Sequence, residues 1–283
     1  MSEQDTDNLQ SQPVSDNQDK NMSARKKALL LARVIGLASE GDYRPADSSV
    51  AERALHRQRK TLSQYQSNLE SIFTMALEFT PSDVTGSDLD VDWSHQFFQM
   101  AEQIHGRKMQ QLWAKILASE IIKPGNYSLR TLATLRQLTL REAVILEKAL
   151  GMSVRFNQEP RLKLLNSYKL TGGVKQYFRK STTSTMGLSQ FGMPYSNILT
   201  LIEAGILYSS EFETGLLEAR SPMTLTLSDS QLRLTPKQGH LLFNYYRFTP
   251  IGDELCSLIT PRHDSEYCNH LCQVLKMDFK VET

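Results

Sequence analysis

The chain has few cysteines, no long apolar run and almost no net charge. Three Cys in 283 residues do not make a disulfide framework, which predicts a reducing, cytoplasmic location. No segment approaches the run of about 18 apolar residues that a membrane-spanning helix needs. The 32 Lys and Arg nearly balance the 31 Asp and Glu, so the net charge favours neither nucleic acid nor an anionic membrane. Any such binding must come from a local patch.

The first 22 residues also lack apolar periodicity. They are polar and acidic, so they resemble neither a secretory signal nor a basic transit peptide. Such a segment buries too little apolar surface to offset the entropy of an ordered chain. The sequence predicts a disordered tail over residues 1–22.

Apolar residues make up 40% of the chain, which is enough for a substantial core. A short basic amphipathic helix is predicted from Ser23 to Gly41, with a basic face that is solvated or, alternatively, faces acidic lipid or a partner. A longer helix is predicted from Ser49 to Phe79, because apolar residues recur every seven positions, as in a coiled coil. Packing inside a bundle and a seam between two copies both explain this spacing. The candidate self-association residues are Leu55, Leu62, Tyr65, Leu69 and Ile72.

After a first apolar run from Trp93 to a break at Gly106, residues 109–151 show the pattern of helix, turn, helix, turn, helix. Trp113 shares a face with apolar neighbours and is predicted to anchor the core. Pro124-Gly125 ends its helix, Ser128 caps the next, and Thr139 with Glu142 forms a capping box for the third. The sequence therefore predicts a helical bundle over residues 23–151.

Several of these stretches resemble a known family. They are "RKTLSQYQSNLESIFTMAL", "LWAKILASEIIKPGNYSLRTLATLRQLTLREAVILEKAL" and, more weakly, "LIEAGIL" with "FTPIGDEL". Together they are similar to a widespread family of bacterial proteins catalogued only as a domain of unknown function, over residues 57–255. The resemblance implies a shared fold and brings no known activity.

The C-terminal segment has a different composition. A helix from about Pro194 to Gly205, two strand-like runs and a helix opened by Thr249-Pro250 follow in the order expected of a winged helix. A small α+β cap of another type is the alternative. The predicted fold is mainly α, with a helical bundle followed by a small α+β winged-helix-like domain over residues 152–283.

No catalytic residue, metal site or cofactor is predicted. Asp88, Asp90 and Asp92 alternate as in a calcium loop, but the sixth and twelfth positions hold Trp93 and Gln99 instead of Gly and Glu. The Cys and His residues near the C-terminus lack the spacing of a zinc site. Nucleophile elbows and phosphate-binding glycine loops are missing as well. The sequence therefore predicts that the protein is not an enzyme.

The most distinctive polar feature is a basic segment with interleaved aromatic residues, of the kind that tracks a phosphate backbone. Its candidate nucleic-acid-binding residues are Arg155, Arg161, Lys163, Lys169, Lys175, Arg179 and Lys180. The acidic segment 78–102 contains no Lys or Arg, so the two segments are alternatively expected to pair with each other.

The leading hypothesis is a non-enzymatic cytoplasmic interaction or regulatory protein that self-associates or binds a protein partner. The alternative is a nucleic-acid-binding, winged-helix-like protein that acts in regulation or phage defence through segment 155–180. No small-molecule substrate is indicated.

Overall fold

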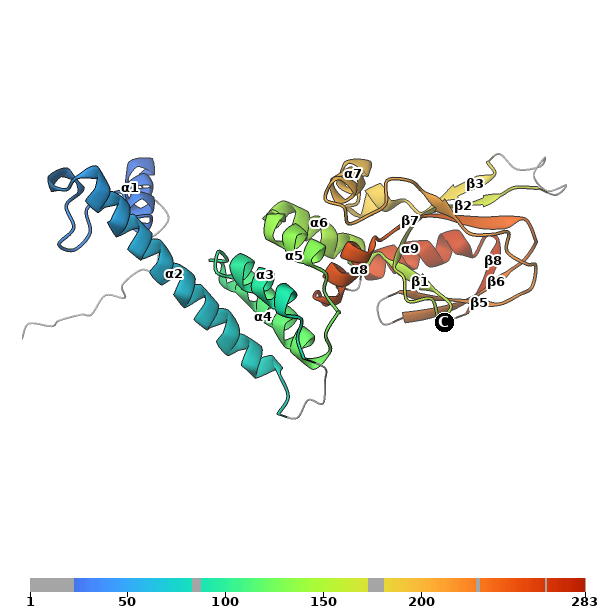
Figure 1. Cartoon of the computed structure of the whole chain (residues 1–283). Coiled ribbons are helices and arrows are strands. Elements are labelled where there is room, and N and C mark those ends of the chain that lie inside the picture. The colour runs from blue at the N-terminus through green and yellow to red at the C-terminus, as the bar shows by residue number, and fades with distance from the viewer. Residues whose placement is uncertain (1–22, 83–87, 173–180, 228–229, 263, 283) are drawn as a thin grey trace, which may run out of the picture. The chain divides into compact units, whose positions relative to one another are not determined.

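The structure is a computed structural model that describes residues 23–82, 88–172, 181–227, 230–262 and 264–282. The predicted disordered tail lies outside these ranges. The chain divides into two compact units, Met1–Ser67 (unit 1) and Asn68–Thr283 (unit 2). Figure 1 shows the elements of both. The boundary predicted at residue 151 stays a prediction.

Unit 1 contains α1 (Ala24–Val34), the short 3-10 helix η2 (Pro45–Asp47) and the first part of α2 (Val50–Phe79). Ser23 caps α1 as predicted, since its hydroxyl accepts a hydrogen bond from the backbone N–H of Lys26. The chain then turns at Gly36, whose φ is +75°. A Cβ at this position would lie 3.4 Å from the Cα of Arg57, so a glycine permits the close approach to α2.

Unit 2 begins with a helical part. Its elements are the rest of α2, α3 (Val91–Ala101), α4 (Arg107–Ile122), α5 (Leu129–Gln137) and α6 (Leu140–Gly151). The predicted caps are confirmed for α5 and α6: Ser128 caps α5, and Thr139 with Glu142 forms a capping box on α6. Asp90 caps α3. These short-range signals fix where each helix begins.

Aromatic side chains form the centre of the helical core. Trp113 is fully buried, which confirms its predicted role, and its ring centroid lies 5.2 Å from that of Phe97. Trp93 stacks on Phe97 at 5.1 Å, and its indole N–H donates to the carbonyl of Tyr127 at 2.8 Å. The Trp93–Tyr127 hydrogen bond ties α3 to the turn before α5.

The rest of unit 2 is built on an antiparallel sheet. Among the described residues the sheet has eight strands: seven pair in the order β4-β7-β2-β1-β5-β6-β8, and the eighth, β3, pairs with β2. The strands are β1 (Val154–Phe156), β2 (Lys163–Leu170), β3 (Thr183–Thr185), β4 (Phe212–Glu213), β5 (Met223–Leu227), β6 (Ser230–Pro236), β7 (Leu241–Arg247) and β8 (Phe279–Glu282). The connecting helices are η4 (Leu188–Phe191), α7 (Tyr195–Glu203), α8 (Pro250–Ser257) and α9 (Ser265–Leu275).

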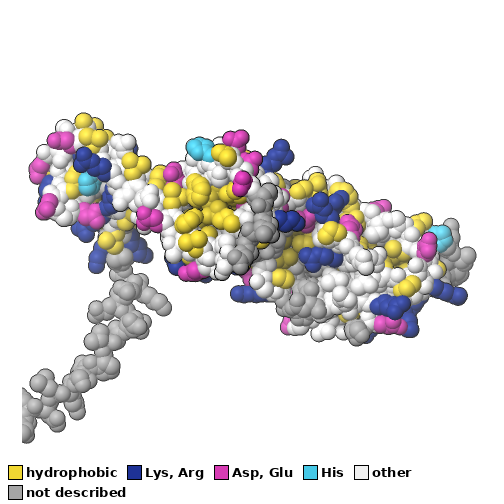
Figure 2. All heavy atoms as spheres, turned by 60° about the horizontal axis from the view of Figure 1, so that its bottom comes forward, with side chains coloured by type: hydrophobic (Ala, Val, Ile, Leu, Met, Phe, Trp, Pro, Cys, Tyr) yellow, Lys and Arg dark blue, Asp and Glu magenta, His cyan; other side chains and the backbone are white. Residues whose placement is uncertain are grey.

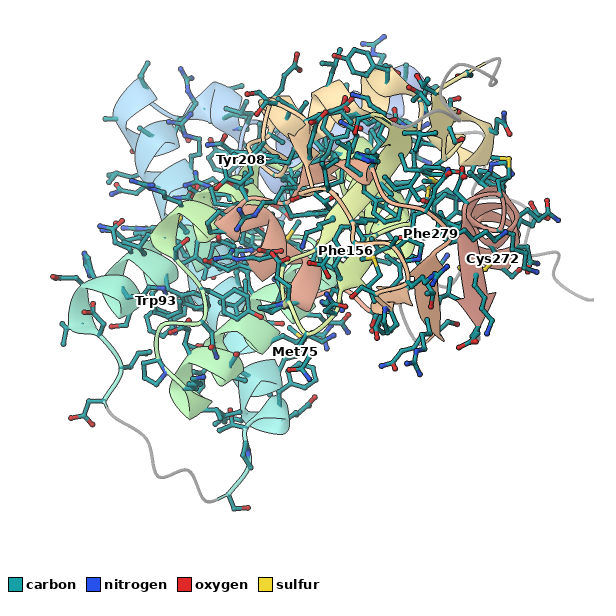
Figure 3. The ribbon with its side chains drawn as sticks, turned by 90° about the vertical axis from the view of Figure 1, so that its right-hand side faces the viewer. Met75, Trp93, Phe156, Tyr208, Cys272 and Phe279 are labelled. Atoms are coloured by element: carbon teal, nitrogen blue, oxygen red, sulfur yellow. The ribbon has the colours of Figure 1, made fainter. Side chains whose placement is uncertain are left out.

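Helix α9 packs on the sheet through Tyr267, Leu271 and Leu275, all fully buried (Figure 1). The sheet has its own aromatic core, in which Phe243 stacks on Phe279 with centroids 5.3 Å apart and contacts Phe156 at 5.4 Å. Figure 3 shows Phe156 and Phe279 in the sheet part and Trp93 and Met75 in the helical part. The aromatic clusters of the helical part and of the sheet part belong to one continuous hydrophobic core, which runs through unit 2.

The predicted fold class is wrong. The part of the chain that the structure describes is mixed α/β with an eight-stranded antiparallel sheet, and the C-terminal segment is not a small winged-helix-like domain. The prediction missed β1 and β2, because their charged residues conceal an apolar pattern. In β2 Leu164, Leu165 and Tyr168 are buried, but they lie between Lys163 and Lys169. The residues taken for a wing form parts of one large sheet.

Candidate functional site

The described residues of unit 1 include many apolar side chains but form no apolar core. None of the described large hydrophobic residues from 23 to 67 is buried, and α1 contains no buried residue of any type. Its exposed apolar side chains, 39–67% accessible in α1 and the turn that follows it, are Leu29, Leu30, Leu31, Val34, Ile35 and Leu37. A folded segment that exposes so much apolar surface is typical of an interaction site.

The contacts inside unit 1 are mostly polar or aromatic. Lys60 of α2 donates to the carbonyl of Arg33 at the end of α1, at 2.6 Å, and pairs with Glu40. The ring of Tyr43 stacks on that of His56, with centroids 3.7 Å apart. An open cleft of about 760 Å³ lies beside these contacts and is lined by residues of α1, the connecting loop and α2. The helices are held together while their apolar residues stay accessible.

The predicted self-association residues of α2 have different environments. Leu55 and Leu62 are 52% and 57% exposed, Tyr65 and Leu69 are half-buried, and Ile72 is 1% exposed and belongs to the core of unit 2. Ile72 therefore cannot contact a partner while the chain is folded. The remaining positions stay candidates for self-association.

Two further residues of α2, missed by the sequence analysis, extend this face. Phe73 and Leu77 are 47% and 58% exposed, and they follow Leu69 at intervals of four residues. Such intervals place side chains on one helix face. The four-residue spacing from Leu69 to Phe73 and Leu77 is visible in the sequence, but the heptad pattern predicts contacts at other positions.

We name Leu55, Leu62, Leu69, Phe73 and Leu77 the α2 stripe. It is separate from the buried face of the helix, which consists of Asn68, Ile72, Met75 and Ala76. Figure 2 shows hydrophobic side chains gathered on one face of the helical part of unit 2. Helix α2 thus has one face in the core and a second apolar face exposed.

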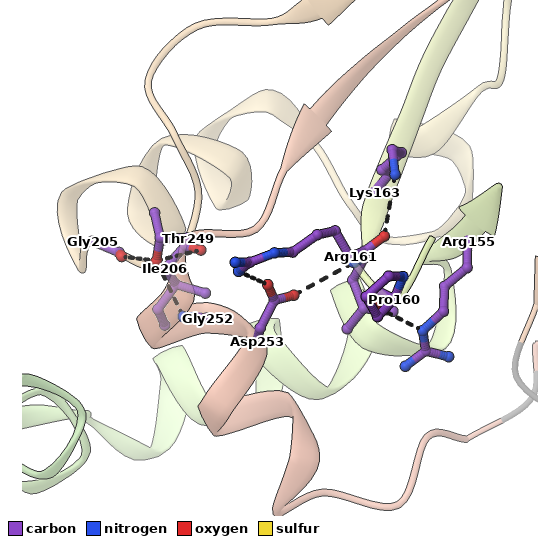
Figure 4. A network of polar contacts seen from close by, with 10 residues as sticks. Arg155, Pro160, Arg161, Lys163, Gly205, Ile206, Thr249, Gly252 and Asp253 are labelled. Carbon is purple, nitrogen blue, oxygen red and sulfur yellow. Dashed lines mark hydrogen bonds and ion pairs between the residues drawn. The ribbon is translucent and has the colours of Figure 1, made fainter. Parts of the chain in front are cut away.

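The basic segment is engaged in contacts within the sheet part. Arg161 pairs with Asp253 of α8 at 2.8 Å, which raises the pKa of the guanidinium, and Arg155 donates to the carbonyl of Pro160 (Figure 4). Lys169 pairs with Glu213 at 3.1 Å. The other candidates Lys175, Arg179 and Lys180 lie outside the described residues. None of these contacts involves the acidic segment 78–102. The described residues therefore do not show the predicted pairing of the basic segment with the acidic segment.

Lys163 is the most constrained of these cations. It is 2% exposed, its ammonium lies 2.7 Å from Glu159, and it faces the rings of Phe156 and Tyr245 at 5.3 and 5.7 Å. These contacts join Lys163 of β2 to Phe156 of β1 and Tyr245 of β7. In this position Lys163 cannot contact a phosphate backbone.

Glu120 has a structural role at the Pro124-Gly125 turn. It is 2% exposed, and its two carboxylate oxygens accept the backbone N–H groups of Gly125, at 2.7 Å, and Tyr127, at 2.5 Å. In a neighbouring contact, Glu254 of α8 accepts the N–H of Ser128 at 2.7 Å. The conspicuous Leu112–Leu132 stretch is thus explained by core packing and by hydrogen bonds that fix a turn.

The three cysteines are free and are not activated. Burial raises the pKa of Cys256, Cys268 and Cys272, which disfavours the reactive thiolate at neutral pH. Within the described ranges, no group of three His, Cys, Asp or Glu is placed to hold a metal ion. His263 of the Cys and His cluster lies outside those ranges. No helix in the described part of the chain is long and apolar enough to cross a membrane.

Comparison with known proteins gives one finding. No curated protein and no solved structure matches the chain. A family model, described as a protein of unknown function, matches residues 52–272 and so covers most of the chain and nearly all of unit 2. This match confirms the resemblance to a domain of unknown function. The chain belongs to the family described as Protein of unknown function (DUF2806).

Proposed function

We propose that the protein is a non-enzymatic, cytoplasmic interaction protein that self-associates through unit 1 and the α2 stripe. One observation carries the proposal: none of the large hydrophobic side chains described in unit 1 is buried. Apolar surface removed from water contributes roughly 25 cal/mol per Å², and unit 1 gains little of this energy within one chain. A second chain that covers this surface would supply it.

The length of α1 supports the same conclusion. It has 11 residues, and isolated helices shorter than about 12–15 residues are marginally stable in water. In most proteins a helix of this size is stabilised by packing an apolar face. The apolar residues of α1 are exposed, so a partner would stabilise both the helix and the complex.

The polar residues support an interaction role over an enzymatic one. Glu120 holds a turn, Lys163 joins three strands and Asp253 pairs with Arg161. Each of these charged side chains has a structural partner, and the described members of the basic segment are engaged in the same way. We expect the activity of the protein to reside in its exposed apolar surface.

The test is the mass of the purified full chain by light scattering at tens of micromolar. We expect a mass of at least two chains for the wild type. The double variant Leu55→Glu/Leu62→Glu should be monomeric, with its dissociation constant raised about 100-fold or more, because a charge in an apolar interface is left without a partner. Both residues are exposed, so the variant should fold.

Leu216→Glu is the matched control, because Leu216 is 58% exposed but lies between β4 and β5 in the sheet part of unit 2. It should leave the mass unchanged. A wild type that is strictly monomeric at this concentration would reject self-association. An oligomer that the double variant does not weaken would reject the surface.

A further inference from the structure

We infer that two copies associate with their α2 helices antiparallel, so that the basic half of one helix lies along the acidic half of the other. This inference rests on the proposed self-association and adds the orientation of the two chains. It depends on how charge is distributed along α2 beside the α2 stripe.

Charge changes sign within the helix. Residues 23–67 contain nine Lys or Arg and four Asp or Glu, and residues 68–106 contain seven Asp or Glu and no Lys or Arg. Inside α2 the exposed basic residues Arg57 and Arg59 lie before the midpoint, and the exposed acidic residues Glu70 and Glu78 lie after it. An antiparallel neighbour places opposite charges beside each other, and a parallel neighbour places like charges there.

The opposite charges of one α2 cannot meet each other. The helix is continuous over 30 residues, which corresponds to a length of about 45 Å at 1.5 Å per residue. Arg59 and Glu70 are eleven positions apart on this rod, about 16 Å along its axis. An interhelical contact between them requires a second α2. A second copy of this chain provides one with the matching charge.

Arg59 and Glu70 occupy equivalent positions beside the α2 stripe. Arg59 precedes Leu62 by three residues, and Glu70 precedes Phe73 by three residues. Both therefore flank the α2 stripe on the same side. In an antiparallel pair of helices, flanking residues of the same side face each other across the seam. Arg59 of each copy would lie beside Glu70 of the other, which gives two equivalent ion pairs in a symmetric dimer.

The first test is a charge swap. Arg59→Glu should raise the dissociation constant about tenfold at low salt, because two attractive pairs become repulsive. Glu70→Arg should have a similar effect, and the double variant R59E/E70R should return to within about twofold of the wild type. Arg130→Glu, a charge reversal at an exposed residue of α5, is the matched control and should leave association unchanged.

Each outcome is decisive. A wild type that associates but is unaffected by R59E and E70R rejects the antiparallel arrangement and leaves self-association standing. A double variant weaker than either single variant also rejects it. A monomeric wild type rejects self-association itself, and the inference with it.

Cysteine crosslinking gives an independent readout of orientation. Gln66→Cys places a thiol near the predicted midpoint, so on oxidation the two copies should join through a disulfide between their introduced thiols, mapped by mass spectrometry. Leu55→Cys should not crosslink to its own equivalent, because antiparallel packing separates these positions by about 28 Å at 1.5 Å per residue. Equal crosslinking at both positions would indicate parallel helices and overturn the inference.

Discussion

Helices α1 and α4 have similar apolar residues and different environments. In α4 seven residues are buried, among them Trp113, Ile116 and Leu117, whereas α1 buries none. Both helices show amphipathic spacing, and both have ordinary helix-forming residues. Periodicity in the sequence therefore identifies an apolar helix face. It does not reveal whether the same chain or a partner covers that face.

Helix α2 contains the same contrast in one element. Ile72 is 1% exposed, whereas Leu62, which continues the same heptad pattern, is 57% exposed. The heptad spacing alone predicts the same environment for both positions. Substitutions at buried and at exposed positions should therefore differ in their effect on the free energy of unfolding.

The largest effect is expected for Trp113→Ala. Removing this fully buried ring should lower the free energy of unfolding by about 3–5 kcal/mol, since the core loses both apolar contact and packing. Denaturant unfolding followed by circular dichroism measures the loss. Leu62→Ala, compared at a concentration where the protein is monomeric, should change it by under about 0.5 kcal/mol. Similar losses from both variants would show that unit 1 has a core that the exposed side chains do not reveal.

An intermediate effect is expected for Glu120→Gln. The amide can accept one of the two backbone hydrogen bonds, but its NH₂ group must face the other N–H. The resulting unpaired buried donor should cost about 1–3 kcal/mol of unfolding free energy.

Glu147→Gln is the control for this variant. Glu147 pairs with Arg262, whose side chain is 87% exposed, so solvent screens the pair and the cost should be under about 1 kcal/mol. Equal costs for the two variants would mean that Glu120 does not hold the turn. Both costs are read from the midpoint of denaturant unfolding.

The smallest effect is expected at the capping box of α6. Hydrogen bonds from the backbone N–H and the hydroxyl of Thr139 lower the pKa of Glu142. A carboxylate with a lowered pKa in the folded state stabilises the protein above its unfolded-state value, about 4.3, and this contribution is lost as the pH falls through the folded-state pKa.

Glu142→Gln should therefore have a slightly lower melting temperature than the wild type at pH 7. The difference should shrink towards zero as the pH falls below about 4, because both proteins are then neutral at this position. Subtracting the melting temperature of the variant from that of the wild type at each pH cancels the effect of the other titrating groups, because both proteins share them. A difference that does not change with pH would exclude the charge of Glu142 as its cause.

The helical part of unit 2 could be predicted well. Ser128, Thr139 and Glu142 are capping signals that act within three residues, and Trp113 lies among apolar residues at helical spacing. The sheet part could not be predicted from the sequence. Strand β2 pairs with β7, which lies more than 70 residues later, and the register of the pair depends on both strands. The charges of Lys163 and Lys169 suggested an exposed binding surface, but their partners Glu159 and Glu213 were not recognisable from the sequence.

Local patterns in the sequence were enough to establish where the helices of unit 2 begin and end, which aromatic residue anchors their core and which family the chain belongs to. These properties follow from local hydrogen bonds and from spacing along the chain. The folded arrangement was needed to establish that Arg161, Lys163 and Lys169 are in ion pairs, that Glu120 holds a turn, and that the apolar residues of α1 stay exposed. Burial and pairing depend on contacts between residues distant in the chain, which local patterns do not specify.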